Sequence, residues 1–270
     1  MGVISSYTAV YAQGEIDHQQ RVFFRNEWSV GLMINSNGFG GNYRYGQRIN
    51  AADKRLYEID FAYLRDPKEF RSYVVERNSN ARYVEGKTNF AVNFRIGYGK
   101  QHERFRKHDR GGIAIRRFHN FGPSIAVLKP IYYNVGTSTM GRLPLDPLPD
   151  NPHRYSPMWN SSNIWVINRA SFFKGFSEIG IVPGAFGKFG YNFEFGSHDR
   201  IIHALEAGLI AEGFLQRLQI MDFGNPDINH SRIAQNQQFF LTVFLSYRFG
   251  RIVDPYEVRK KRERSREISY

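Results

Sequence analysis

The sequence has no cysteine and no long hydrophobic run, and each absence excludes a class of protein. Without cysteine, the chain forms no disulfide and has no thiolate ligand for a metal. A membrane-spanning helix requires roughly 18 consecutive apolar residues, and no stretch approaches that length. The mean hydropathy of -0.49 also excludes a bundle of membrane helices. Neither observation excludes a membrane β-barrel, because only every second residue of its strands faces lipid.

Basic charge, glycine and aromatic residues are abundant. The formal net charge of +12 is spread along the chain, apart from a dense run at Arg259–Arg266. No recognition helix, zinc-finger spacing or RNA-binding signature accompanies this charge, so we expect no nucleic-acid partner. Anionic outer-membrane lipid is the expected partner instead. The 25 glycines and the 16% aromatic content predict many strands joined by tight turns.

The strongest pattern is an alternation of period two, which is typical of β-strands. Large apolar residues alternate with small, polar or charged ones at Val22–Ile34, Tyr57–Tyr63, Phe90–Gly99, Lys188–Phe195 and Phe240–Phe249. Weaker strands are predicted at Asn42–Gln47, Gly112–Phe118, Ser124–Tyr133, Ile164–Phe173 and Ile202–Glu212. Ile164–Phe173 fits a short helix as well as a strand. Counting it as a strand gives about ten strands, and eight or twelve remain open because bacterial barrels have even numbers.

The predicted connections are unequal in length. Tight turns are expected at Asn50–Lys54, His119–Pro123 and Gly196–Arg200. Long loops are expected at Asp66–Lys87, Gly136–Ser162 and Gln216–Gln237, the second of them rich in proline. Short turns at one end and long loops at the other are typical of membrane barrels.

Two features favour a barrel with its apolar face outward over a soluble sheet. The apolar faces carry Phe and Tyr near the strand ends, where an interfacial aromatic girdle lies. The polar faces mix glycine with isolated charges of both signs, as a narrow lumen requires. The predicted lumenal charges are Arg25, Glu27, Glu58, Asp60, Arg95, Glu194, Glu206 and Arg248. The predicted lipid-facing residues are Phe24, Trp28, Phe61, Phe94, Tyr98, Phe193, Val243, Tyr247 and Phe249.

The pattern divides the chain into three parts. Residues 1–20 are interpreted as a signal-peptide remnant with an N-terminal extension, because small residues near Ala12 suit a signal peptidase, and a disordered N-terminus is the alternative. Residues 21–250 form the all-β closed antiparallel transmembrane barrel. Residues 251–270 form a basic periplasmic tail. The tail is expected either to bind a partner through Arg259, Lys260, Lys261, Arg262 and Arg264 or to be a disordered basic extension.

Four phrases together carry a family resemblance: Tyr45–Glu69, Tyr83–Gly99, Gly111–Tyr133 and Pro183–Gly196. They resemble a poorly characterised family of outer-membrane β-barrels from Bacteroidetes-type bacteria. The likeness covers the chain from about Trp28 to Phe249. It implies an outer-membrane location and, at most, membership of an envelope assembly. It implies no catalytic residue.

The sequence therefore favours a non-enzymatic outer-membrane protein, structural or accessory to an envelope complex. A small channel or ligand transporter is the first alternative, although a barrel this narrow is expected to be plugged by its own paired charges. A barrel enzyme acting on envelope lipid is the second alternative. His119 and His203 are its candidate residues, but nothing in the sequence pairs them with a carboxylate or serine. No cofactor, metal site or catalytic residue is predicted.

Overall fold

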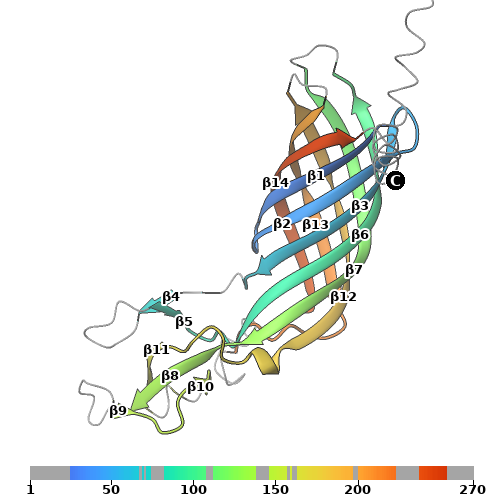
Figure 1. Ribbon diagram of the computed structural model, residues 1–270. Coiled ribbons are helices and arrows are strands. Elements are labelled where there is room, and N and C mark those ends of the chain that lie inside the picture. Colours follow the sequence, from blue (N-terminus) through green and yellow to red (C-terminus); the bar gives the residue numbers. More distant parts are fainter. Residues whose placement is uncertain are drawn as a thin grey trace, which may run out of the picture.

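The structure is a computed structural model that describes residues 25–66, 69, 71–73, 82–107, 112–137, 146–156, 159, 163–196, 200–222 and 237–253. Eight strands close into an antiparallel barrel in the order β1-β14-β13-β12-β7-β6-β3-β2 (Figure 1). They are β1 (Asn26–Asn35), β2 (Gly38–Arg48), β3 (Asp53–Leu64), β6 (Asn89–Phe105), β7 (Ala114–Pro130), β12 (Gly180–Phe195), β13 (Ile201–Phe214) and β14 (Phe239–Val253). Closure between β1 and β14 leaves no open sheet edge within the barrel. No helix in these ranges is long and apolar enough to span a membrane.

The barrel has eight strands and not the ten that the sequence favoured, for two reasons. First, the predicted turn at His119–Pro123 is wrong, because β7 runs straight through it. The ladder to β6 keeps the same register on both sides, with Arg95 opposite Ser124 and Tyr98 opposite Phe121. Proline lacks one ladder donor, but this interruption does not shift the register. Second, the predicted strand Ile164–Phe173 does not enter the barrel.

Gly122 explains why a Gly-Pro pair is compatible with a continuous strand here. A Cβ at this position would lie 1.9 Å from the carbonyl oxygen of Ile96 on the neighbouring strand. Only glycine allows the two backbones to approach this closely. The residue that indicated a turn in the sequence is therefore a close-contact point between β6 and β7.

The strands outside the barrel form a lobe beyond one of its ends (Figure 1). β8 (Tyr132–Thr137) pairs with β9 (Asp146–Pro147), β10 (His153–Arg154) and β11 (Ile164–Arg169), while β4 (Arg71–Tyr73) pairs with β5 (Arg82–Val84). A 3₁₀ turn, η3 (Phe176–Glu178), leads back to β12. The lobe has its own apolar core, in which Tyr133 packs between Tyr83 and Trp159.

The two ends of the barrel differ. The lobe and the connections after β3, β7 and β13 lie at one end, which we call the long-loop end. The β2–β3 and β12–β13 turns, the start of β1 and the end of β14 lie at the other, the short-turn end. Outer-membrane barrels keep their short turns in the periplasm, so the long-loop end faces outside. Residues 1–20 and the five predicted tail cations from Arg259 to Arg264 lie outside the described residues.

Candidate functional site

The outer surface of the barrel is apolar. Every second side chain on the strands points outward, and the exposed ones include Leu32, Phe61, Phe94, Val243 and Leu245. Phe94 is 48% exposed, whereas its neighbour Arg95 is 1% exposed. A soluble barrel would show the reverse arrangement. Strands β6 and β7 have 17 residues each, longer than the roughly 9–11 that cross a bilayer.

Aromatic rings mark both edges of this apolar belt. At the short-turn end, Tyr57 contacts Tyr98 with ring centroids 5.5 Å apart, and His203 packs against Tyr247 and Phe249. At the long-loop end, Phe39, Tyr63 and Phe90 form a chain of ring contacts at 5.7 and 4.8 Å. Such girdles lie at the two headgroup layers of a bilayer. The outward cations Arg55, Lys100 and Arg117 lie just beyond the short-turn girdle, where charge meets headgroups and water.

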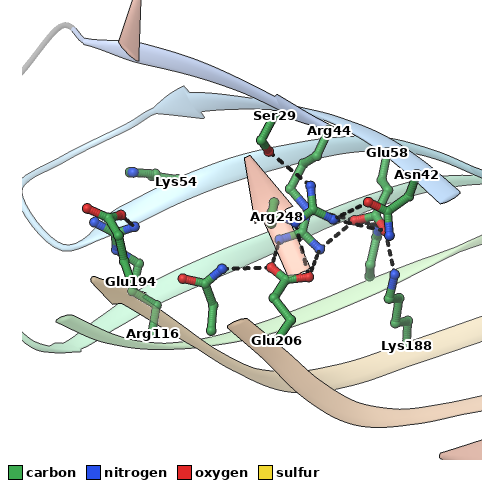
Figure 2. A network of polar contacts seen from close by, with 12 residues as sticks. Ser29, Asn42, Arg44, Lys54, Glu58, Arg116, Lys188, Glu194, Glu206 and Arg248 are labelled. Atoms are coloured by element: carbon green, nitrogen blue, oxygen red, sulfur yellow. Dashed lines mark hydrogen bonds and ion pairs between the residues drawn. The ribbon is translucent and has the colours of Figure 1, made fainter. Parts of the chain in front are cut away.

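The middle of the lumen holds a balanced network of charges (Figure 2). Glu58 contacts Arg44 at 2.6 Å and the Lys188 ammonium at 2.5 Å. Glu206 binds both Arg44 and Arg248, while Arg95 joins Asp60 at 2.9 Å and Glu212 at 3.0 Å. Four cations therefore face four carboxylates: Arg44, Arg95, Lys188 and Arg248 against Glu58, Asp60, Glu206 and Glu212. All eight are at most 5% exposed, so the pairing avoids the cost of uncompensated buried charge.

A second group of charges lies nearer the short-turn end. Glu27 pairs with Lys54, and Glu194 pairs with Arg116 and Lys107. Figure 2 shows Arg116 and Glu194 set apart from the central network.

An apolar cluster of side chains also lies in the lumen. Phe118 and Phe244 pack with Met33, Leu56 and Ile210 in one cluster. The guanidinium of Arg44 lies 4.6 Å from the centre of the Phe118 ring, and the ammonium of Lys188 lies 4.8 Å from that of Phe244. These cation–π contacts connect the apolar cluster to the charge network.

A segment after β13 closes the long-loop mouth of the barrel. Leu218, Ile220 and Met221 are nearly fully buried and pack with Phe214 and Phe240 of the barrel wall. We call these three residues the mouth plug. The backbone N–H groups of Thr88 and Asn89 donate to the Ile220 carbonyl at 3.1 and 3.3 Å. The plug is thus bonded to the segment that leads into β6.

The predicted lumenal charges occupy several places. Seven of the eight point inward and are buried: Glu27, Glu58, Asp60, Arg95, Glu194, Glu206 and Arg248. Five of the seven belong to the central network: Glu58, Asp60, Arg95, Glu206 and Arg248. Arg25 precedes β1 and is half-buried.

The predicted lipid-facing residues lie on the outward side where they are described. Phe61, Phe94, Tyr98, Val243, Tyr247 and Phe249 are exposed, whereas Trp28 and Phe193 are half-buried. Phe24 lies outside the described residues. The three network residues that the prediction omitted are Arg44, Lys188 and Glu212. The alternation did contain a signal for Arg44, because it lies between the outward Tyr43 and Tyr45.

Among the described residues, neither candidate histidine has a carboxylate partner. His119 and His203 both lie on the outer face, on β7 and β13. His203 Nδ1 is 2.8 Å from the Tyr247 hydroxyl, as a girdle residue would be. Within the described ranges, no group of three or more His, Asp or Glu side chains could hold a metal ion.

Comparison with solved structures gives distant alignments to outer-membrane barrels. Neisserial surface protein A (NspA) aligns with a TM-score of 0.38 and 8% identity, over 84% of this chain and 96% of that one. Ail, the attachment invasion locus protein of Yersinia pestis, solved with the heparin analogue sucrose octasulfate, aligns with a TM-score of 0.35 and 6% identity, over 85% and 97%. Neither a protein-family model nor a curated sequence matches the chain.

The burial pattern of the chain itself is more informative than these distant alignments. Apolar side chains face outward between two aromatic girdles, paired charges face inward, and the strands close on themselves. Only a closed barrel satisfies its backbone in lipid with strands alone. The chain is an outer-membrane β-barrel protein with eight strands.

Proposed function

We propose that this chain is a non-conducting barrel that serves as a structural or accessory subunit of an envelope complex. The observation that carries the proposal is the filled lumen. An eight-stranded barrel has an interior just wide enough for its own side chains. Here the charge network, the apolar cluster and the mouth plug occupy that interior. A conducting path would need these charges unpaired and the plug displaced.

The ends of the barrel supply the surfaces for an assembly. The lobe extends beyond the outer end, and β14 ends at Val253 on the periplasmic side. The basic sequence that follows, with Arg259, Lys260, Lys261, Arg262 and Arg264, is proposed to bind an acidic periplasmic partner. The resemblance of four sequence segments to Bacteroidetes-type barrels supports an envelope of that kind as the setting.

Planar-bilayer recording tests the sealed lumen. Protein whose folding is verified by heat-modifiable migration should add no current steps at any voltage, while a porin reconstituted in the same way conducts. Reproducible ion-selective steps would exclude the sealed barrel and support the channel alternative.

Gentle solubilisation tests the complex. A chain with Gln at the five tail cations should lose a partner that co-purifies with the wild-type protein, and Gln at the lobe residues Arg154 and Lys174 should keep it. Recovery of the wild-type protein only as a bare monomer would contradict the accessory role.

A further inference from the structure

A recess of about 730 Å³ lies where the barrel rim meets the lobe. Its walls come from the β1–β2 hairpin, the end of β3, β5, the start of β6, β8 and β11. Neither the lumen nor the mouth plug contributes to it, so it is separate from the sealed interior. We call it the rim recess.

Lys87 is the central polar group of the rim recess. Its ammonium lies 2.7 Å from Glu69 and 2.5 Å from the hydroxyl of Tyr63, and Lys87 and Glu69 are each nearly fully buried. An ammonium has three N–H donors, and these two contacts use two of them. Among the described residues, the third donor of this buried cation has no acceptor.

The charges that line the rim recess do not balance. Arg65 and Arg169 join Lys87 in the lining, and Glu69 is the carboxylate among the described lining residues. Asp66 and Glu85, neighbours in the sequence, are not part of the lining. Arg65 also uses Glu69, because it donates to the backbone carbonyl at 2.9 Å and its Nε lies 3.5 Å from the carboxylate. The central lumen pairs four cations with four carboxylates, whereas the described lining of this recess has three cations and one carboxylate, an excess that an anion would neutralise.

The lower wall of the rim recess is apolar and lies at the membrane surface. Phe39, Tyr63 and Phe90 belong to the long-loop girdle, and Ile34 beside them is 71% exposed on the lipid-facing side. Tyr83 and Tyr133 of the lobe core line the opposite wall. Burial raises the pKa of both tyrosines above the ordinary value, so their hydroxyls stay neutral, and the Tyr133 hydroxyl donates to the Lys87 backbone carbonyl at 3.1 Å. The recess thus offers cations above an apolar wall that continues toward the acyl chains.

We propose that the rim recess binds the phosphorylated headgroup of an outer-leaflet lipid. The phosphate lies among Arg65, Lys87 and Arg169, because guanidinium groups bind phosphate oxygens in pairs and the ammonium adds a point charge. The adjoining apolar part of the lipid rests on Ile34 and Phe39. A soluble phosphorylated sugar shares the headgroup chemistry but leaves this apolar wall uncovered.

Native mass spectrometry tests the site on the full chain, delipidated and reconstituted in phosphatidylcholine nanodiscs. The probe is lipid A with two phosphates, compared with the same lipid after enzymatic dephosphorylation. Each surface charge contributes roughly fivefold to headgroup affinity, so R65Q/R169Q should weaken retention of the diphosphorylated lipid about 25-fold. R65K/R169K keeps the charge but loses the paired guanidinium contacts, so its affinity should lie between those of wild type and R65Q/R169Q.

The matched control is R154Q/K174Q, which removes two lobe cations outside the rim recess and should bind lipid A within about twofold of wild type. Wild-type affinity in R65Q/R169Q, or equal affinity for the dephosphorylated lipid, would overturn the proposal. Displacement of lipid A by glucose 1-phosphate at equal concentration would assign the recess to a soluble phosphoester and overturn the lipid assignment.

Discussion

Replacing Glu58 with glutamine should destabilise the barrel severely, because Glu58 lies at the centre of the lumenal charges. Its carboxylate is 2.6 Å from Arg44, 2.5 Å from Lys188 and 3.8 Å from Arg248, and its side chain is 1% exposed. Glutamine keeps the shape and removes one negative charge, leaving four cations against three carboxylates. Removing one partner of a buried ion pair costs roughly 3–5 kcal/mol. We expect a loss of about 4 kcal/mol in the free energy of unfolding.

Urea unfolding in lipid vesicles, followed by tryptophan fluorescence, measures this loss. With a slope of roughly 2 kcal/mol per molar urea, the midpoint should fall by about 2 M. The informative comparison is E58Q/K188M, which restores neutrality with three cations and three carboxylates, since Asp60 keeps Arg95. The double variant should recover about 2 kcal/mol relative to the sum of the two single variants.

The exposed lobe residue Glu178 provides the control. It pairs with Arg154 at 3.1 Å with both side chains about half exposed, so E178Q should change stability by no more than about 1 kcal/mol. If E58Q unfolds within about 0.5 kcal/mol of wild type, or if E58Q and K188M are additive to the same margin, the lumenal charges do not act as a network.

Three more perturbations test the outer face, the β6–β7 contact and the short-turn rim. F94K places a charge in the apolar belt and should lower the free energy of unfolding in a bilayer by about 2–4 kcal/mol. The control F105K, near the end of the same strand, should lower it by at most about 1 kcal/mol. Equal effects of the two variants in urea unfolding would contradict the position of Phe94 deep in the bilayer. G122V forces a side chain against the Ile96 carbonyl and should lower the free energy of unfolding by about 3 kcal/mol. The control G180V should be tolerated, because its Cβ would be 3.8 Å from its nearest neighbours. Heat-modifiable migration measures the folded fraction of each variant. Asp53 lies 2.7 Å from His102 at the rim, and that hydrogen bond lowers the pKa of Asp53. The resulting stabilisation is complete above the ordinary Asp pKa of about 3.9 and is lost as pH falls through the lowered pKa. D53N should therefore remove this part of the acid dependence of the free energy of unfolding. An unchanged dependence of unfolding on acid pH in D53N would refute the assignment.

The lumen and the rim recess differ in the balance of their described charges. In the central lumen, four cations are balanced by four carboxylates. The excess cations lie on the outside, at the level of the headgroups, where a lipid can reach them. The lobe contributes walls to the rim recess and extends beyond it, so a bound lipid would link the lobe to the outer leaflet.

The sequence by itself determined the fold class and which face of each strand is apolar. A strand has a period of two, so Phe94 and Arg95 must point to opposite sides whatever the neighbouring strands do. Aromatic residues at strand ends, together with glycine and isolated charges on the opposite face, then indicated that the apolar side faces outward. Seven of the eight lumenal charges that this reasoning selected lie inside the barrel.

Only the tertiary structure decided the strand count and the partners of each charge. Gly122-Pro123 is typical of a turn in the sequence, but pairing with β6 and β12 on either side keeps it in one strand. Likewise, Glu58 and Lys188 are far apart in the chain, and their contact depends on barrel closure and register. The mouth plug and the rim recess are also products of closure, because each joins segments that no local pattern connects. Local periodicity fixes the direction of a side chain, whereas its neighbours across a closed ring are set by the register of all eight strands together.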